Sequence, residues 1–422
     1  MILEQIVTDH SWNFTQCSIK DTSYITHSYY TYPAKFIPQL ANRLIMEYSH
    51  KGDLVVDSFM GSGTTLVESL ITQRKSIGVD INEIAFLVSK IKTTPIEPLR
   101  LIASFSELKS AYLKNKQDTS IETQPFIHEK IDYWYKETQK KELTILLHTI
   151  LKIDEVDTKD FFLVAFAQIL KTCSIWLQKS VKPTRDLNKK ESDVFDTFNR
   201  HATKMIKKAD EFYRKLTPSI IKNLEQLRII KCQDARQIPC EDNGATLVIT
   251  SPPYVTSYEY ADLHQLPLYW LGHLKELSQF RQKFIGSSCS QRTVMTTYSK
   301  TAEDIINKLT HKKKQEVANY FADMYEVFVE MYRFLKPQGK ACIVIGNTNF
   351  RGVEIKNAEV FIEQMQHIGF NIFNVIKREI PSKMLPSTRD DKTGRFSKIT
   401  GDNLTLAYPT EYILIMQKGA KK

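Results

Sequence analysis

The chain has 422 residues, of which 42% are hydrophobic and 25% are charged. This composition is typical of a soluble globular protein with a sizeable core, and 14 glycines and 15 prolines are too few for a collagen-like or Pro/Gly-rich disordered chain. We expect no membrane span, because no run of about 18 apolar residues occurs. We expect no secretory signal, because the first residues show no basic region followed by an apolar core. Six scattered cysteines without a Cys-x-x-Cys pair favour a reducing cytoplasm and predict neither disulfides nor a metal site.

Basic residues outnumber acidic ones and are unevenly distributed. The net charge is +10, from 58 Lys and Arg against 48 Asp and Glu. The excess is concentrated in residues 171–230, 281–315 and 377–400. Clustered positive charge favours a polyphosphate partner, because each neutralised phosphate releases counterions. The alternative is a basic surface without a partner, and composition leaves both open.

Short strands and helices alternate at both ends of the chain. Residues 54–59 and 76–80 are short apolar runs typical of buried parallel strands, and residues 61–74 and 81–92 have helical periodicity. Further strands are expected at residues 227–235, 245–254, 340–347 and 411–418, with a helix over 324–337. This alternation predicts a doubly wound, mostly parallel α/β sheet of about seven strands.

The middle of the chain differs. Residues 100–226 are Lys/Glu-rich, mostly of helical period, and too long for a crossover loop. We therefore predict a large helical insertion there. It separates an amino-terminal part of the sheet domain, residues 1–99, from a carboxyl-terminal part, residues 227–422.

A glycine-containing turn follows the first predicted strand. Residues 57–65 read Asp-Ser-Phe-Met-Gly-Ser-Gly-Thr-Thr, so that a ligand can approach the backbone at a helix N-terminus. A P-loop would need a Lys before the Ser/Thr, and a dinucleotide fingerprint would need a third glycine. A tight structural turn remains an alternative. Asp80 ends the next strand, where a carboxylate can accept hydrogen bonds from a ribose diol, so a nucleoside cofactor such as S-adenosylmethionine fits both features.

A second motif, Thr250-Ser251-Pro252-Pro253-Tyr254, follows a later strand. Two successive prolines stiffen the backbone and remove two N–H donors. Carbonyl groups, a hydroxyl and an aromatic ring remain, which suit an exocyclic amine and a planar base. A rigid strand-to-loop turn is the structural alternative.

Together these motifs resemble those of S-adenosylmethionine-dependent amino-DNA methyltransferases, most closely the N4-cytosine type with its Ser-Pro-Pro-Tyr box. Residues 30–38 resemble the amino-terminal motif that closes over the methionine end of the cofactor, residues 232–236 the motif that meets its adenine, and residues 335–340 a later turn and strand. The resemblance implies a seven-stranded, Rossmann-like methyltransferase sheet. It implies a catalytic box of Ser251, Pro252, Pro253 and Tyr254, and cofactor-binding residues Tyr32, Lys35, Phe36, Asp57, Phe59, Gly61, Gly63, Thr64, Thr65, Asp80, Ile81, Asp234 and Ala235.

The implied reaction is methylation of cytosine N4 in double-stranded DNA, on a base flipped out of the duplex. The implied setting is a prokaryotic restriction–modification system with a separately acting endonuclease, and the enzyme would be a monomer or homodimer. Adenine N6, an RNA base, or an inactive nucleic-acid-binding protein are the alternatives. Residues 100–226, 272–315 and 381–408 compete as the recognition region. Predicted DNA contacts are Lys182, Arg185, His264, Lys312, Lys313, Lys314, Arg389 and Arg395. The alternatives are a solvated loop for Lys182 and Arg185, a structural role for His264, and a solvated helix face for the three consecutive lysines.

Overall fold

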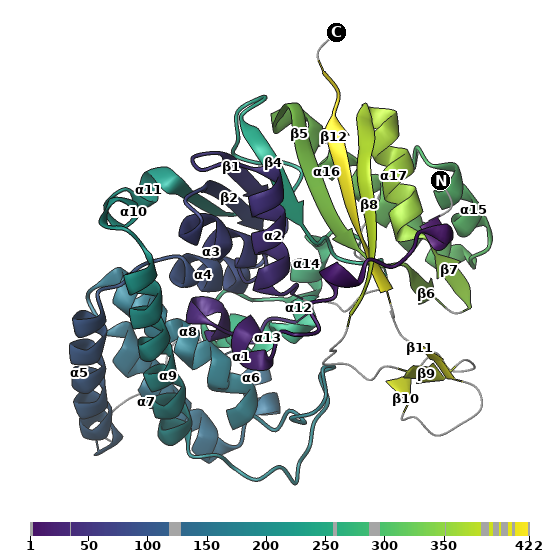
Figure 1. Cartoon of the computed structure of the whole chain (residues 1–422). Coiled ribbons are helices and arrows are strands. Elements are labelled where there is room, and N and C mark those ends of the chain that lie inside the picture. The colour runs from purple at the N-terminus through teal and green to yellow at the C-terminus, as the bar shows by residue number, and fades with distance from the viewer. Residues whose placement is uncertain are drawn as a thin grey trace.

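A single seven-stranded sheet organises the chain in the computed structural model (Figure 1). The structure describes residues 3–33, 35–117, 128–255, 260–286, 296–350, 352–380, 388–390, 396–397, 404–406 and 410–420. The strands lie in the order β3-β2-β1-β4-β5-β12-β8. Their bounds are β1 Leu54–Asp57, β2 Lys75–Asp80, β3 Arg228–Cys232, β4 Ala245–Thr250, β5 Leu335–Ile345, β8 Phe370–Glu379 and β12 Thr410–Lys418.

The sheet is parallel from β3 to β5, and β12 runs antiparallel between β5 and β8. Strand order reverses beside β1, which pairs with β2 on one side and with β4 on the other. In open α/β sheets, ligands bind at such a reversal, outside the carboxyl ends of the strands. The fold predicted from the sequence is therefore confirmed, and it places the two motifs at the same edge of the sheet.

Alternate residues of each strand enter separate cores on the two faces of the sheet. Val55 and Leu247 pack with Leu40 and Leu44 of α2 (Pro38–Tyr48). Val56 and Val248, one position along each strand, enter the core on the other face. That core is filled from α15 (Lys300–Asn307), α16 (His311–Phe334) and α17 (Asn357–Ile368). This two-sided burial explains why the strands read as continuous apolar runs.

The helical insertion forms a separate layer beside the sheet, at the lower left of Figure 1. It spans residues 98–227 and follows α3 (Thr64–Ile71) and α4 (Glu83–Lys92). Its core is rich in aromatic side chains and is continuous with α4. Its helices are α5 Pro98–Gln117, α6 Lys130–Trp134, α7 Glu137–Leu151, α8 Val156–Cys173, α9 Val194–Lys215, α10 Pro218–Lys222 and α11 Leu224–Leu227.

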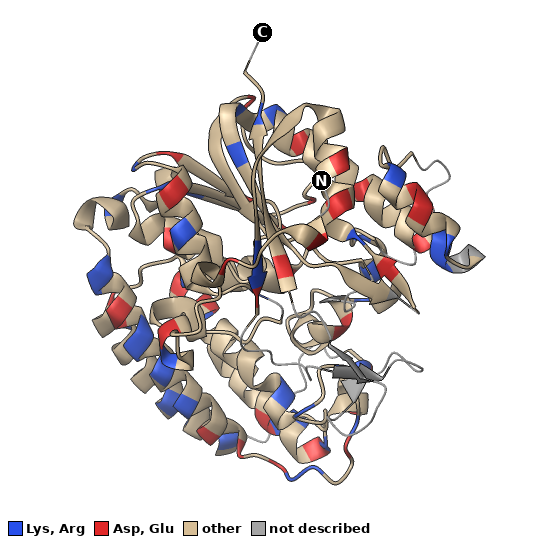
Figure 2. Ribbon diagram, turned by 45° about the vertical axis from the view of Figure 1, so that its right-hand side comes forward, with Lys and Arg blue, Asp and Glu red and all other residues tan. Residues whose placement is uncertain are grey.

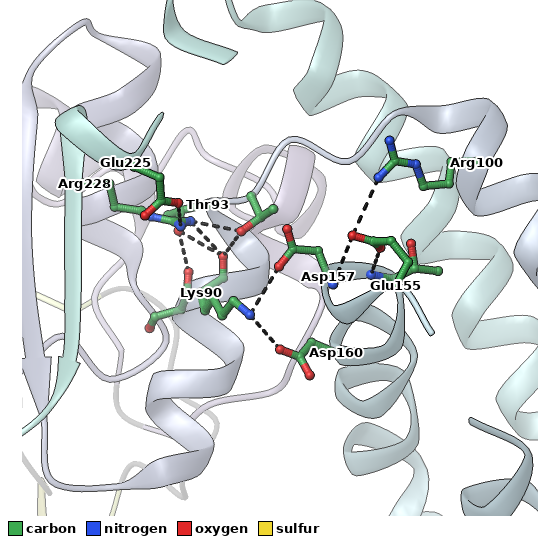
Figure 3. A network of polar contacts seen from close by, with 11 residues as sticks. Lys90, Thr93, Arg100, Glu155, Asp157, Asp160, Glu225 and Arg228 are labelled. Atoms are coloured by element: carbon green, nitrogen blue, oxygen red, sulfur yellow. Dashed lines mark hydrogen bonds and ion pairs between the residues drawn. The ribbon is translucent and has the colours of Figure 1, made fainter. Parts of the chain in front are cut away.

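Polar contacts fasten the insertion to α4 where the chain leaves and re-enters the sheet (Figure 3). Lys90 Nζ lies 3.2 Å from Asp157 and 2.8 Å from Asp160, both on α8. Arg228, at the start of β3, donates from Nη1 to the Lys90 carbonyl at 3.1 Å and to the Thr93 hydroxyl at 2.7 Å. The carboxyl end of α4 is thus capped by the strand that follows the insertion.

The strands expected from the sequence did not include β8. Its sequence is interrupted by polar residues because it is an edge strand, and the amino-terminal segment covers it. Asp9 N donates to the Lys377 carbonyl at 2.8 Å, and Arg378 donates to the Trp12 carbonyl at 2.8 Å.

In the turn that leads into the apolar part of β5, Gln338 has a φ of 65°, the left-handed region that usually favours glycine.

The remaining elements are short. They are the 3-10 helices η1 Leu3–Gln5, η2 His10–Trp12 and η3 Ile25–Ser28, the helices α1 Ile19–Thr22, α12 Tyr260–Leu263, α13 Gln265–Trp270 and α14 Leu277–Gln282, and the strands β6 Thr348–Phe350, β7 Val353–Ile355, β9 Thr388–Asp390, β10 Phe396–Ser397 and β11 Leu404–Leu406. Within the described part of the chain, no helix combines the length and apolarity needed to cross a bilayer.

Candidate active site

A pocket opens where β1, β2 and β4 end, and it encloses about 860 Å³, including the part open to solvent. Both sequence motifs contribute to its walls. The predicted site residues in its lining are Tyr32, Lys35, Phe36, Asp57, Phe59, Gly61, Thr64, Asp80, Ile81, Asp234, Ala235, Ser251 and Pro253. The switch point thus brings together residues that are more than 200 positions apart in the sequence.

The glycine turn lets the backbone and an aromatic ring approach each other closely. Gly61 has a φ of 47°, and a Cβ there would lie 3.1 Å from Tyr32 Cε1. The Gly61 N–H donates to Asp80 Oδ2 at 3.0 Å, and the Asn82 N–H donates to Asp80 Oδ1 at 2.9 Å. Desolvation raises the pKa of Asp80 to about 6, and these two backbone donors oppose that rise. Asp80 is therefore a partly desolvated acceptor in the pocket wall.

Asp57 joins the glycine turn to the catalytic box. Its carboxylate accepts hydrogen bonds from the hydroxyls of Thr65 and Thr250, each at 2.7 Å, and from the Phe59 N–H at 3.1 Å. Burial raises the pKa of Asp57 to about 6, while the two threonine hydroxyls and the Phe59 N–H lower it. Thr250 immediately precedes Ser251, so one carboxylate fixes both sides of the pocket.

Lys35 brings a cationic side chain to the pocket. Its Nζ donates to the His27 carbonyl at 2.9 Å, and burial lowers its pKa to about 8. Near pH 8 a fraction of Lys35 is therefore neutral, and the positive charge that it offers to an anionic ligand falls as the pH rises. A bound anion would favour the protonated amine and raise this pKa.

Asp234 shares its carboxylate with Arg236. Arg236 donates to Asp234 Oδ2 at 2.6 Å and Oδ1 at 3.0 Å, and its Nη1 reaches Asp323 Oδ1 of α16 at 3.1 Å. The ion pairs raise the pKa of Arg236 against the opposing effect of desolvation. An acidic side chain held in this way keeps a fixed direction in the pocket wall.

Sequence reasoning missed part of the lining. Lys283, Phe284 and Ile285 enter the pocket from the segment after α14, and Gln233 precedes the predicted Asp234. Proximity to Asp234 was a usable signal for Gln233. No local pattern marks the other three residues, which reach the pocket only through tertiary packing. Pro33, Ser58, Met60 and Ser62 complete the lining.

Among the described residues, four predicted site residues stand behind the lining instead of in it. Gly63 is the N-cap residue of α3 and has a φ of 71°. Thr65 is buried, and its hydroxyl donates to Asp57. Pro252 is buried, and Tyr254 is half-buried with its ring against the end of β5, where a Cβ at Gly346 would lie 3.3 Å from Tyr254 Cε2. These positions support the pocket in this structure, and their direct roles stay predictions.

Comparison with known proteins agrees with this arrangement. The family model described as "DNA methylase" matches residues 4–90 and 245–422, more than half of the chain. The chain belongs to this family. Residues 91–244, which hold the whole insertion, lie outside the matched ranges.

Individual bacterial methylases resemble the chain over most of its length. The chain is 28% identical to the Type II methyltransferase M.MvaI of Kocuria varians over 94% of this chain and 92% of that one. It is 22% identical to the Type II methyltransferase M.BsoBI of Geobacillus stearothermophilus over 82% and 78% of the two chains. A solved putative DNA modification methylase of Thermus thermophilus, complexed with S-adenosyl-L-methionine, is 16% identical over 44% of this chain and 52% of that one, with a TM-score of 0.20.

The predicted DNA contacts of this methylase are scattered. Lys182 and Arg185 are exposed in the loop after α8, where the Arg185 guanidinium lies 4.2 Å from the centre of the Tyr133 ring. Lys313 forms an ion pair with Glu316, and Lys314 is partly buried on the same turn of α16. The side chains of Lys312 and Arg389, and all of Arg395, lie outside the described residues.

The burial of His264 decides between two roles that the sequence left open. A contact with the target base or a phosphate and a structural role were equally favoured, and only 1% of the residue is exposed, which favours the structural role. Its ring stacks on Tyr32 with centroids 4.7 Å apart, and its Nδ1 lies 3.3 Å from the Tyr30 hydroxyl. Burial lowers the pKa of His264 to about 3, so it is neutral at physiological pH. A buried, uncharged ring cannot contact a backbone phosphate, and His264 instead backs the pocket wall at Tyr32.

Many basic residues lie on the outer helices of the insertion, where acidic residues are interspersed (Figure 2). On α9, Arg200, Lys208 and Arg214 form ion pairs with acidic residues three or four positions away. Part of the positive charge seen in the sequence is therefore compensated locally.

Proposed function

We propose that this methylase transfers a methyl group from S-adenosylmethionine to the exocyclic N4 amine of a cytosine in double-stranded DNA. One observation carries the proposal. Ser251 and Pro253 of the catalytic box line the same pocket as Gly61 and Asp80 of the cofactor motifs. A methyl donor and an amine bound to the two parts would therefore meet at the carboxyl ends of β1 and β4.

The lining fits S-adenosylmethionine in its chemistry. Asp80 offers a carboxylate to a ribose diol, and Ile81, Phe36 and Phe284 offer apolar surface to an adenine ring. Lys35 offers positive charge to a carboxylate. When bound, the cofactor supplies an electrophilic methyl group on sulfur.

The chain's own residues then orient the amine. The nitrogen lone pair of an aromatic amine is delocalised into the ring and must be freed to attack. We expect the Ser251 hydroxyl and the Pro252 carbonyl to accept the two amine hydrogens, which directs the lone pair at the methyl group. The new N–C bond forms as the S–C bond breaks. Ser251 is a weak base, so the amine proton leaves afterwards, to water. Tyr254 stacks on the extruded base.

The biological setting that we propose is a Type II restriction–modification system, in which a separate endonuclease recognises the same DNA site. The two Type II methyltransferase relatives support this setting. The serine at the first position of the box favours cytosine over adenine by resemblance to the N4 type.

Isotope-labelled S-adenosylmethionine incubated with the protein and either DNA or RNA tests the proposal. Mass spectrometry of nucleosides from the digested product should show N4-methylcytosine from DNA and no label in RNA. Detection of N6-methyladenine instead would change the assigned target base to adenine and leave the proposed mechanism unchanged. Cofactor binding without transfer to any nucleic acid would overturn the enzymatic function.

A further inference from the structure

The catalytic box needs anchors from outside itself. Pro252 and Pro253 carry no N–H, so the box cannot hold its own path with backbone donors over those two positions. The structure supplies one anchor on each side. Asp57 accepts the Thr250 hydroxyl at 2.7 Å before the box begins, and the Tyr320 hydroxyl donates to the Pro253 carbonyl at 2.7 Å near its end. Ser251 and Pro252 lie between these two points.

Tyr320 is well suited to hold such a point. It lies on α16, it is only 1% exposed, and its ring belongs to the core beneath the sheet. Gly286, with a φ of 69°, passes directly over that ring, and a Cβ there would lie 2.7 Å from Tyr320 Cδ2. The residues just before Gly286 form a wall of the pocket. Tyr320 is therefore clamped between the catalytic box and that wall, so its hydroxyl has little freedom to move.

The same face of α16 also reaches the cofactor side. Residues three apart on a helix share a face, and Asp323 is three positions after Tyr320. Asp323 Oδ1 lies 3.1 Å from Arg236 Nη1, and the Gly286 N–H donates to Asp323 Oδ2 at 3.3 Å. Arg236 in turn fixes Asp234 in the pocket lining. Asp323 is 4% exposed, so its carboxylate is shielded from water, whereas the Arg236 side chain is 31% exposed.

We propose that Tyr320 and Asp323 are positioning residues for methyl transfer, and that α16 sets the spacing between the catalytic box and the cofactor. Tyr320 fixes the box through Pro253, and Asp323 fixes the cofactor side through Arg236. The inference rests on the proposed function, because it assigns a role in that reaction. It predicts two separable defects: one in the chemical step and one in cofactor affinity.

Tyr320→Phe removes the hydroxyl and keeps the ring. With the wild-type substrate DNA, we expect the single-turnover rate to fall roughly 10-fold, because the partly buried Pro253 carbonyl loses its donor and the box can shift. Dissociation constants for DNA and S-adenosylmethionine should change less than about twofold. Tyr325→Phe is the matched control, since Tyr325 lies on the same helix and its hydroxyl contacts His367 Nδ1 at 3.0 Å, away from the box.

Asp323→Asn should show the complementary defect, with S-adenosylmethionine binding weakened about 3- to 10-fold in calorimetric titration and a smaller loss of rate at saturating cofactor. This arm also decides the inference if Tyr320→Phe does not fold. An unchanged rate in folded Tyr320→Phe, or the same loss in Tyr325→Phe, would overturn the role of Tyr320. Unchanged cofactor affinity in Asp323→Asn would overturn that of Asp323. The activity of the wild-type protein separates the two claims. If the wild type methylates DNA and neither variant shows its expected defect, only this inference is contradicted. If the wild type methylates no nucleic acid, the proposed function is contradicted as well.

Discussion

The pocket at the sheet edge and the helical insertion are built by different means. The pocket is assembled from short contiguous motifs whose side chains are fixed by backbone donors and by one buried carboxylate, Asp57. The insertion is held by a core of aromatic rings and fastened to α4 by charged side chains such as Lys90. The matched family ranges include most of the pocket and leave out the whole insertion. The two regions thus differ in how they are held together, and the family model matches the sheet-edge motifs and not the insertion.

The dependence of DNA affinity on salt concentration tests whether the insertion contributes to DNA binding. If basic segments such as the loop with Lys182 and Arg185 bind backbone phosphates, DNA affinity should fall by ~10³ or more between about 50 and 200 mM salt for six contacts. Replacing both residues by Gln should reduce the steepness of that dependence without changing the preferred sequence. Fluorescence anisotropy at several salt concentrations measures the slope. Replacing Lys313 and Lys314 is the comparison, since Lys313 already pairs with Glu316. An unaltered slope would show that the loop is only a solvated surface.

Tyr254 tests the chemical side of the comparison. Stacking of a base on an aromatic ring is worth ~1–3 kcal/mol, so Tyr254→Ala should slow methyl transfer roughly 10- to 150-fold. Tyr254→Phe should retain most of the rate. S-adenosylmethionine affinity should change little in either variant, because Tyr254 stands outside the described lining of the pocket. A loss of cofactor binding equal to the loss of rate would show that the ring supports the pocket instead of the base.

Replacing Asp80 should weaken cofactor binding about 5- to 150-fold. Asp80→Ala removes a charged acceptor from the ribose and should cost ~1–3 kcal/mol of binding. Because the pKa of Asp80 is raised to about 6, the carboxylate is ionised above that pH and becomes protonated as the pH falls through it. Wild-type affinity should therefore weaken below about pH 6. Asp80→Asn should show a flatter profile in calorimetric titrations, and identical profiles would remove Asp80 from the binding site.

Lys90 gives the smallest expected effect and tests the attachment of the insertion. Lys90→Ala breaks the pairs with Asp157 and Asp160 and should cost about 1 kcal/mol of stability, seen as a lower Tm. Lys140→Ala is the control, because Lys140 also has two acidic partners but both lie within the insertion. If the attachment matters for DNA binding, only Lys90→Ala should weaken it. Equal DNA affinity in the two variants would separate the attachment from recognition.

Sequence reasoning reached the sheet and most of the pocket because the strands are fully buried and the motifs are contiguous. It missed β8, whose polar residues reflect pairing with the amino-terminal segment. It also missed Phe284 and Tyr320, which act on the pocket through packing of segments that are distant from the motifs along the chain. The role of His264 was left open for a similar reason. A lone histidine after the box carries no local sign that it will stack under Tyr32.

The central claim is that the box around Ser251 and the cofactor motifs form one catalytic site. Single-turnover methyl transfer by Ser251→Ala, measured alongside its affinities for DNA and S-adenosylmethionine, tests this claim most directly. We predict at least a roughly 10-fold loss of rate with both affinities nearly unchanged, because the hydroxyl acts on the amine during transfer. A fully active Ser251→Ala enzyme would contradict the assignment of this pocket as the place of methyl transfer.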